Sequence, residues 1–324
     1  MNEIPGFDSR SVSQELTEKL VLAAELYYIY DLPQKDIAAR LGVSRPWVSK
    51  LLKRAEEIGI VRIDVNTNTA GISDIEKKLI DKYGLKNAKI VKTSTADNSL
   101  ALAQAAHAAA HFLVSIIEPR DTIGIAWGST LAAMFNQYLP VSFPDVTVVP
   151  LVGGIGRNAD ILSNQLASRL ATSLGAKYRL LHTPAFVVGK QERETIMNDP
   201  ATKELIEMTE NVDIAILAMS TLDITHAFTK FGYMSRQEYD ELVGLNVAGD
   251  VALRFIGHDG AIANHNAHDK LIAGDLSKTV KHARYSIGFA LGQRKVPIIR
   301  AALKGKWMNV LISDLETATA VLDE

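Results

Sequence analysis

The sequence contains no cysteine, which excludes disulfide bonds, thiolate nucleophiles and cysteine-based zinc or iron–sulfur sites. It also lacks the roughly 18 uninterrupted apolar residues that a membrane-spanning helix needs, and its N-terminus, MNEIPGFDSR, lacks the basic-then-apolar pattern of a signal peptide. A net charge of −2 excludes a globally basic nucleic-acid coat but allows a local basic patch. These absences predict a cytoplasmic protein with no membrane partner.

The chain has 324 residues, of which 47% are hydrophobic and 22% charged, as is typical of a folded protein. This length is too great for one typical domain and sufficient for two, each with its own core. A polar stretch of short side chains begins at Thr67 and is suited to a linker. We therefore expect a first domain at 1–66, a linker at 67–72 and a second domain at 73–324.

A basic patch lies in the first domain. Residues 1–66 are nearly neutral as a whole, yet the 15 residues from Arg40 to Arg54 contain five Lys or Arg side chains and no carboxylate. Positive charge on one face is the electrostatic requirement for contact with DNA phosphates. The patch therefore marks this segment as a candidate nucleic-acid interface.

The residues around the patch have the pattern of a helix–turn–helix. Apolar side chains recur at helical spacing over 17–30, and a second, short helix is predicted over 34–41. Gly42 supplies the left-handed residue that ends this helix, and Ser44 is a good N-cap for a third helix that begins at Arg45. In a helix–turn–helix, the start of this last helix contacts base edges in the major groove.

The third predicted helix, from Arg45 to about Ile58, turns an apolar stripe inward and its cationic side outward. The alternating residues 61–65 after it indicate a strand, and hence a small wing. The alternative is a surface helical hairpin with a solvated basic face, but the turn glycine, the N-cap and the acid-free face together favour DNA binding. The predicted DNA contacts are Ser44, Arg45, Pro46, Trp47, Ser49, Lys50, Lys53 and Arg54. Arg45, Pro46, Trp47 and Ser49 are expected nearest the bases, and the three later cations on or near phosphates.

Beyond the linker, short apolar runs alternate with helical stretches. The apolar runs lie at 89–91, 122–126, 146–152, 214–218 and 308–312. The clearest helical stretches lie at 100–117, 162–174 and 296–304. Strands that are apolar on both faces and separated by helices indicate a doubly wound, mostly parallel α/β sheet.

In such a sheet, ligands collect where strands end and helices begin. Gly128 follows a predicted strand and lets the backbone approach a ligand, while Ser129 and Thr130 add hydroxyl groups at the first turn of the next helix. A phosphate group fits this loop. An ordinary strand-to-helix turn with Ser129 as its cap fits equally well, and the residue pattern leaves both interpretations open.

A second glycine loop raises an alternative function. Gly154, Gly156 and Ala159 have the spacing of the dinucleotide-binding fingerprint, which would indicate a nicotinamide-dependent enzyme. That fold also places a carboxylate about 20 residues further on, to bind the ribose hydroxyls. The corresponding stretch, 178–184, contains no carboxylate. We therefore interpret the loop as one wall of a ligand pocket.

Several polar residues are candidates for this pocket. In the glycine loop they are Gly153, Gly154, Arg157 and Asn158, although surface exposure explains the last two equally well. Asp250 and Arg254 are further candidates. A hydrolase or isomerase would use the Asp250 carboxylate as acid or base, whereas a position directly after a glycine also suits a turn or cap.

No metal site and no cofactor are predicted. His107 and His111 share a helix face, but alanine stands where a zincin motif requires glutamate. His265 and His268 are better explained by a polar loop than by metal ligation.

Six segments, taken in order, carry a resemblance to one protein family. LPQKDIAARLGVSRPWVSKLLKRAEEIGIV, at 32–61, is followed along the chain by IGIAWGSTLAAM, VVPLVGGIG, YRLLHTPAFV, AGDVALRFIGHDG and KGKWMNVLISDLETA. All six resemble segments of the SorC/DeoR-type family of bacterial sugar-responsive transcriptional regulators. The resemblance implies a non-enzymatic effector domain related in fold to sugar-phosphate isomerases. It also implies a homodimer or homotetramer that binds operator DNA with palindromic or repeated half-sites.

The resemblance also bears on the ligand. In the family, the loop that corresponds to 128–130 holds a sugar phosphate, and a cation that corresponds to Lys295, or secondarily Arg294, lies near the phosphate. Some members carry a lysine directly before the paired glycines, where it captures an aldehyde as a Schiff base. This chain has Val152 there, so a reversible, hydrogen-bonded phosphosugar is implied.

The sequence therefore predicts a DNA-binding regulator of a carbohydrate operon, controlled by a phosphorylated sugar. The alternative is a sugar-phosphate isomerase-like or nicotinamide-dependent enzyme with an N-terminal interaction module. Whether the protein acts as a repressor or an activator stays open, as do the identity of the sugar and the operator sequence.

Overall fold

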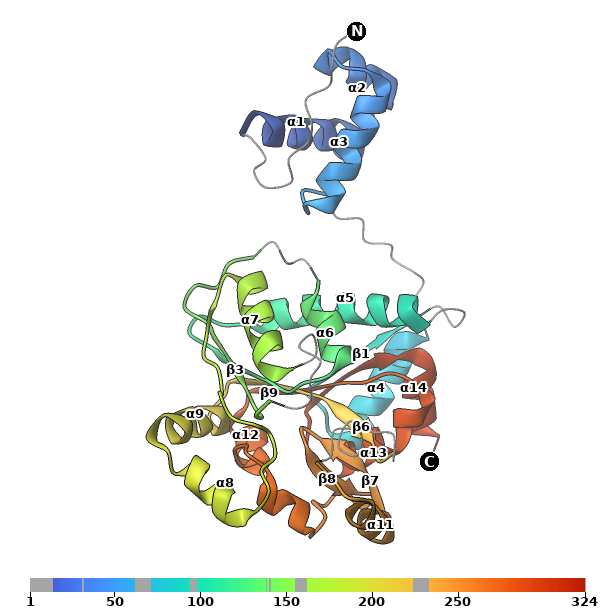
Figure 1. Ribbon diagram of the computed structural model, residues 1–324. Coiled ribbons are helices and arrows are strands. Elements are labelled where there is room, and N and C mark those ends of the chain that lie inside the picture. Colours follow the sequence, from blue (N-terminus) through green and yellow to red (C-terminus); the bar gives the residue numbers. More distant parts are fainter. Residues whose placement is uncertain are drawn as a thin grey trace. The chain divides into compact units, whose positions relative to one another are not determined.

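The computed structural model describes residues 14–30, 32–61, 71–93, 98–137, 139, 141–154, 162–223 and 233–323 (Figure 1). The chain divides into two compact units, residues 1–68 and 69–324. Each unit has its own hydrophobic core. The two units are described here as the N-terminal unit and the effector unit.

The described residues of the N-terminal unit, 14–30 and 32–61, form three α-helices, with one turn of π-helix after the first. The elements are α1 (Gln14–Ala24), the π-turn η1 (Glu25–Ile29), α2 (Gln34–Leu41) and α3 (Arg45–Glu57). Leu20, Ile37 and Val48 from the three α-helices are fully buried and meet in the core. The sequence predicts one helix over 17–30, whereas the chain widens into the π-turn at Glu25. The Tyr28 hydroxyl in this turn donates to Glu56 Oε1 on α3 at 2.7 Å.

A seven-stranded parallel sheet forms the centre of the effector unit, in the order β1-β10-β9-β5-β2-β3-β4. The strands are β1 (Asn87–Val91), β2 (Thr122–Ile125), β3 (Thr147–Pro150), β4 (Lys177–Tyr178), β5 (Ile214–Leu217), β9 (Tyr285–Phe289) and β10 (Val310–Asp314). Because β2, β5 and β10 are flanked by strands and covered by helices, nearly all their residues are buried. The predicted doubly wound α/β fold is confirmed.

Helices cover both faces of this sheet (Figure 1). One face carries α5 (Asn98–Ile116), α6 (Ser129–Phe135) and α7 (Ser163–Leu174). The other carries α4 (Ile72–Tyr83), α9 (Pro200–Glu210), α12 (Leu276–His282), α13 (Val296–Lys304) and α14 (Leu315–Leu322). Right-handed crossovers explain the division, because connections that advance from β1 toward β4 place their helices on one face and those that return place them on the other.

Helix α5 is, in the described part of the chain, the one helix long and apolar enough to cross a membrane by length and composition. Its inner face packs on the sheet, where Ala105, Ala109 and Leu113 are fully buried. Only 33% of its most apolar window is buried, so much of this uncharged helix lies on the surface of the effector unit.

A second, antiparallel sheet lies beside the large one and was not predicted. It has the order β6-β7-β8, with β6 at Met219–Thr221, β7 at Val247–Val251 and β8 at Arg254–Gly257. β7 and β8 are joined by Ala252 and Leu253, both with positive φ, of 45° and 68°. Hairpins of this kind usually carry glycine or asparagine at those positions, so the residue types do not indicate the turn.

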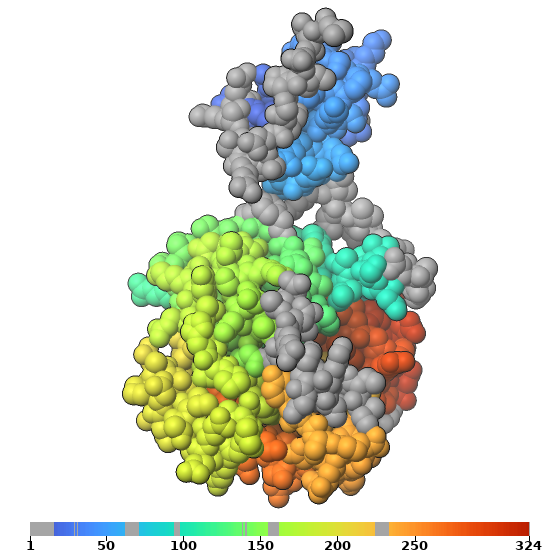
Figure 2. Space-filling view, viewed as in Figure 1, coloured from blue at the N-terminus to red at the C-terminus, as the bar shows by residue number. Residues whose placement is uncertain are grey.

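Four further described elements belong to the effector unit. They are α8 (Lys190–Met197), α11 (Arg236–Gly244) and the short 3-10 turns η3 (Asn266–Lys270) and η4 (Gln293–Lys295). In the space-filling view, the yellow-green surface near residue 190 borders the orange surface near residue 270 (Figure 2). The Arg193 Nε atom donates to the Leu271 carbonyl oxygen at 2.8 Å across this border.

Candidate functional site

The turn between α2 and α3 has the geometry that a helix–turn–helix needs. Gly42 ends α2 in the left-handed region, with φ of 65°, and its N–H donates to the Ala38 carbonyl oxygen. Ser44 stands at the N-cap of α3 in an extended conformation, but its side chain accepts no capping hydrogen bond. The Ser44 hydroxyl is therefore exposed at the helix start, where it can meet a phosphate oxygen.

Most of the predicted DNA contacts lie on one outer surface of α3. Exposed side chains are found at Ser44, Arg45, Pro46, Ser49, Lys50 and Lys53. Two predicted contacts are less available. Trp47 is half-buried against the core of the N-terminal unit, and the half-buried Arg54 forms an ion pair with Glu57 at 3.1 Å. The predicted wing at 62–65 lies outside the described residues.

The start of α2 adds two candidates that the sequence reasoning missed. Gln34 and Lys35 occupy the first turn of α2, after Pro33 at its N-cap. In helix–turn–helix complexes the first helix of the motif crosses the DNA backbone. Proline at the N-cap was the available signal, because it fixes where the unpaired N–H groups of α2 begin.

In the effector unit, a pocket of about 390 Å³ lies at the carboxyl ends of β1, β2, β9 and β10. Among its lining residues are Asn98, Ser129, Thr130, Gly292, Lys295 and Glu316. Ser129, Thr130 and Lys295 are three of the predicted effector residues, and Gly128 precedes them. The pocket therefore brings together two segments that are about half the chain apart in sequence.

Gly128 is required by the backbone of this pocket. Its φ of 125° lies in a region that other residues rarely adopt. The chain turns there from β2 into α6, so that the N–H groups of Ser129 and Thr130 begin the helix without partners in the preceding turn. Ser129 and Thr130 both line the pocket.

Lys295 is the cation of the pocket. Its Nζ donates to Thr130 Oγ1 at 3.4 Å, while the neighbouring Arg294 is exposed. Burial lowers the pKa of Lys295, and the charge of Asp250 opposes that shift. An anion bound beside Thr130 would favour the charged lysine in the same way.

Asp250 lies on β7, behind Lys295, and is 3% exposed. Burial raises its pKa to about 7, although the Leu253 N–H, the charge of Lys295 and the Ser220 side chain each lower it. The Leu253 N–H donates to Asp250 Oδ2 at 3.0 Å, so the carboxylate also holds the β7–β8 turn. The hydrogen bond supports the turn interpretation of Asp250. Asp250 does not line the pocket, although its charge acts on Lys295, so its predicted contact with a ligand stays a prediction.

The raised pKa of Asp250 predicts an unusual pH dependence of stability. Its pKa is about 7 in the folded protein and 3.8 in an unfolded chain, so between these values the folded state binds the extra proton. The free energy of unfolding should therefore fall as pH rises through this range, by up to about 1.4 kcal/mol per pH unit. Asp250→Asn should flatten this slope in denaturant titrations between pH 5 and pH 7.5. The exposed Asp81→Asn should retain the wild-type slope; equal slopes in all three proteins would contradict a proton on Asp250.

Asp314, at the end of β10, organises the opposite wall and was not predicted. Its carboxylate accepts the Thr317 N–H at 2.8 Å and the Gly292 N–H at 3.2 Å. It thus ties the start of α14 to the loop that carries Lys295. Asn98 and Glu316 line the pocket beside it and supply amide and carboxylate groups for hydroxyl ligands.

Arg254, a predicted effector residue, does not line the pocket around Lys295. Arg254 pairs with Val251 across the β7–β8 turn, and Asp250 pairs with Phe255, so Arg254 and Asp250 lie on opposite faces of the hairpin. The Arg254 Nη2 donates to the Gly274 carbonyl oxygen at 2.6 Å. Burial, with the nearby charge of Arg193, lowers the pKa of Arg254 to about 10.

Gly153 and Gly154, the described residues of the glycine loop after β3, do not line the pocket. A side chain at Gly153 would stand 2.4 Å from the Pro184 carbonyl oxygen, so this glycine is explained by close backbone packing. The Gly154 N–H donates to the Thr183 carbonyl oxygen at 2.9 Å. Arg157 and Asn158 lie outside the described residues, so their predicted contacts with a ligand stay predictions.

The histidines considered as metal ligands have other contacts. His265 Nε2 lies 3.0 Å from Glu241 Oε2, and His268 Nε2 accepts the Phe255 N–H at 3.0 Å. Burial lowers the pKa of His268 to about 4. Across the described residues, no group of three or more His, Asp or Glu side chains is arranged to hold a metal ion.

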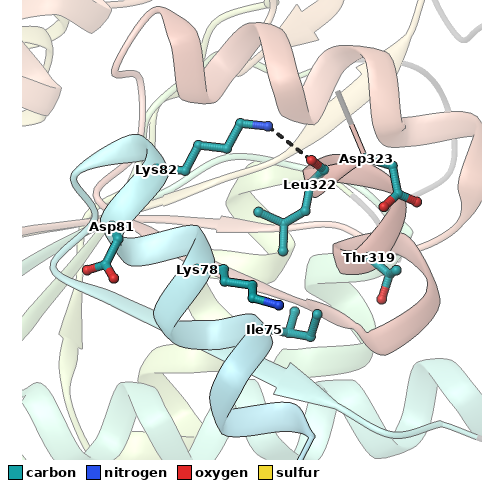
Figure 3. A pocket seen from close by; sticks show the side chains of 7 residues that line it. All are labelled: Ile75, Lys78, Asp81, Lys82, Thr319, Leu322 and Asp323. Carbon is teal, nitrogen blue, oxygen red and sulfur yellow. Dashed lines mark hydrogen bonds between the residues drawn. The ribbon is translucent and has the colours of Figure 1, made fainter.

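A larger groove of about 720 Å³ lies elsewhere, between α4 and α14 (Figure 3). Ile75 and Leu322 form its apolar part, and the Lys82 Nζ reaches across it to the Leu322 carbonyl oxygen at 3.1 Å. None of the predicted effector residues lines it. Size alone therefore does not identify a ligand site, and the convergent polar groups around Lys295 make the smaller pocket the stronger candidate.

Both units of the chain are similar to known protein families, and full-length relatives match nearly the whole chain. The profile of the sugar-binding domain family matches residues 67–323, and that of a homeodomain-like domain matches residues 14–62. The sorbitol operon regulator of Klebsiella pneumoniae is 30% identical over 307 residues, which cover 94% of this chain and 97% of that protein. The deoxyribonucleoside regulator of Bacillus subtilis is 29% identical over 314 residues, which cover 97% and 100%.

Solved structures give the same result. The crystal structure of the full-length sorbitol operon regulator SorC from Klebsiella pneumoniae superposes with a TM-score of 0.80, covering 97% of this chain and 100% of that one. A DeoR family transcriptional regulator from Listeria monocytogenes is 27% identical and superposes with a TM-score of 0.72, covering 78% of this chain and 99% of that one.

Proposed function

The chain belongs to the SorC/DeoR-type family of sugar-responsive transcriptional regulators, and from this premise we propose that a phosphorylated sugar in the Lys295 pocket controls how its N-terminal unit binds operator DNA. The observation that carries the proposal is the Lys295 Nζ, which lies 3.4 Å from Thr130 Oγ1 among the residues that line the pocket. A lysine and a hydroxyl at the start of a helix are suited to a phosphate group.

The rest of the pocket suits the sugar. Asn98 and Glu316 line it together with Lys295 and offer hydrogen-bond partners for hydroxyl groups. A volume of about 390 Å³ is in the range of small-molecule sites. The relatives named above are regulators of a sorbitol operon and of deoxyribonucleosides. Phosphorylated polyols and pentoses are therefore the first ligands to test.

DNA recognition is assigned to α3. Arg45 and Ser49 lie on its exposed side, where they can reach base edges, and Lys50 and Lys53 can reach phosphates. One such unit makes few contacts, so useful affinity requires at least a homodimer, with half-sites one helical turn, about 34 Å, or a multiple of it apart. The family resemblance favours a homotetramer, and we place the protein in the cytoplasm.

The regulation follows from differential binding. A ligand that binds one arrangement of the effector units more tightly shifts the population toward it. If that arrangement spaces the N-terminal units differently, the ligand changes the affinity for the operator. The change cannot exceed the ratio of the ligand's affinities for the two arrangements. Ligand and operator then affect each other's binding reciprocally.

A phosphosugar panel tests the proposal. We expect one compound to raise the unfolding temperature of the effector unit, because a ligand at 100 times its Kd adds about 2.7 kcal/mol of stability. The same compound should change a gel shift with DNA from the vicinity of the gene and should be recovered unchanged. Conversion of the compound would instead support the isomerase-like alternative, and a shift with nicotinamide dinucleotides the dehydrogenase alternative.

A further inference from the structure

The walls of the pocket around Lys295 differ in charge. Among the lining residues that the structure describes, Lys295 is the one cation, whereas Asp314 and Glu316 are carboxylates. Lys295 contacts Thr130 in the first turn of α6, and the two carboxylates stand at the start of α14. Within the described part of the chain, Lys295 forms no ion pair with either of them. The cation of the pocket therefore does not neutralise the negative charge at the start of α14.

Asp314 is engaged by the fold itself. It is 7% exposed, and its carboxylate accepts the Thr317 N–H at 2.8 Å, the Thr317 hydroxyl at 2.6 Å and the Gly292 N–H at 3.2 Å. The Thr317 N–H is one of the groups at a helix start that an anion would otherwise bind. Asp314 thus occupies the start of α14 in the way that a bound anion would.

Glu316 is the carboxylate of the pocket that is available to a ligand. Its side chain is exposed in the first turn of α14, and Gln293 Nε2 donates to its Oε1 atom at 3.3 Å. Among the described residues, the Glu316 Oε2 atom has no hydrogen-bond partner. An ionised carboxylate accepts hydrogen bonds but donates none, so Glu316 suits a ligand hydroxyl and repels a second anionic group.

We propose that Glu316 is a specificity residue, which restricts the effector to sugars or polyols with a single phosphate and an otherwise uncharged, hydroxyl-bearing chain. The phosphate binds beside Lys295, and a hydroxyl group further along the ligand donates to Glu316. A sugar bisphosphate or a phosphorylated sugar acid would bring a second anion to a wall whose described residues include two carboxylates and no further cation. This inference rests on the proposed function, because it requires the phosphate at Lys295.

Charge, and not size, makes this distinction. A carboxylate and a hydroxymethyl group are of nearly equal size, so a pocket of about 390 Å³ cannot separate them by volume. The difference in affinity must come from an interaction that the second anion lacks or that opposes it. Because Glu316 is exposed, water and salt screen its charge, and the expected discrimination is moderate and depends on ionic strength.

Matched pairs of ligands test the proposal by calorimetric titration of the full chain. The pairs are glycerol 3-phosphate with 3-phosphoglycerate, sorbitol 6-phosphate with 6-phosphogluconate, and ribulose 5-phosphate with ribulose 1,5-bisphosphate. In each pair that binds, the wild type should prefer the first compound at least about tenfold. Glu316→Gln should raise the affinity for the second compound at least about fivefold, because the repulsion is lost. It should lower the affinity for the first about two- to fivefold, because a neutral acceptor replaces a charged one.

A matched control removes a carboxylate from the other end of the same helix. Asp323 is the C-cap of α14 and lines the groove between α4 and α14 (Figure 3). Asp323→Asn should therefore keep the wild-type preference within each pair. Added salt should reduce the preference of the wild type and of Asp323→Asn more than that of Glu316→Gln, because only the first two retain the charge of Glu316. A purely steric role of Glu316 would give the same salt dependence in all three proteins.

Lys295→Met separates this inference from the proposed function. If Lys295→Met weakens binding but the wild type binds both members of each pair equally, the phosphate site stands and the role of Glu316 is wrong. The same conclusion follows if Glu316→Gln leaves the preference of the wild type unchanged. If none of the six compounds binds, or if binding does not depend on Lys295, the phosphate site fails and the inference fails with it.

Discussion

Lys295→Met is expected to reduce the affinity for the phosphosugar roughly 10- to 150-fold, which corresponds to the 1.5–3 kcal/mol of a hydrogen bond to a charged group. Methionine keeps the length and apolar stem of the side chain but removes the Nζ that lies beside Thr130. Asp250 loses the positive charge that lowers its pKa, so it takes up a proton more readily and no unpaired carboxylate is left at neutral pH. Calorimetric titration with the phosphosugar measures the loss.

The neighbouring residue provides the control. Arg294 stands next to Lys295 in η4 but is exposed, so Arg294→Met should leave the affinity within about twofold of wild type. Thr130→Val should weaken the ligand response while DNA binding is retained, because it removes the hydroxyl that Lys295 contacts. If the Lys295→Met protein and the wild type bind the phosphosugar with equal affinity, the phosphate does not bind beside Lys295.

Arg45→Ala is expected to weaken specific operator binding by about 1–3 kcal/mol and to relax the preference at one base pair. Arg45 is the first residue of α3 and is exposed, and the carboxylate-free stretch around it leaves its guanidinium available for a guanine. Competition gel shifts with single-base operator variants measure both effects.

A Lys53→Ala variant separates sequence-specific recognition from sequence-independent attraction to phosphates. It is exposed two turns further along α3, so Lys53→Ala should weaken binding to all sequences by a similar factor and lower the salt dependence by about one counterion. If Arg45→Ala behaves in the same way as Lys53→Ala, with discrimination unchanged, then Arg45 contacts a phosphate and another residue reads the bases.

The N-terminal unit could be predicted in detail because its signals are local. Gly42 and Ser44 determine where α2 ends and α3 begins, and helical spacing selects Ile37 and Val48 for the core. Trp47 was the exception. Its position on the helix surface is visible in the sequence, but its packing against the core depends on how the three helices meet.

In the effector unit, the sequence indicated the kind of fold and part of the site. The predicted helix at 296–304 has the observed bounds of α13, and five predicted strands lie where β1, β2, β3, β5 and β10 were found, with shifted ends. The loop at Gly128 was identified by its residues, and Lys295 by the family resemblance. That the two meet follows from the strand order, which places the ends of β2 and β9 at one edge with only β5 between them.

The sequence by itself therefore determined the elements, the alternation that makes the sheet parallel and the short motifs at its loops, because these depend on residues close together in the chain. Only the tertiary structure decided which distant groups share a pocket. Asp314 and Asn98 line the pocket with Lys295 because the strand order brings their loops together. Arg254 lies outside the pocket because strand pairing turns its side chain to the opposite face of the β7–β8 hairpin from Asp250. The order of strands in a sheet and the face to which each side chain points are set by contacts between distant segments. No local sequence pattern contains that information.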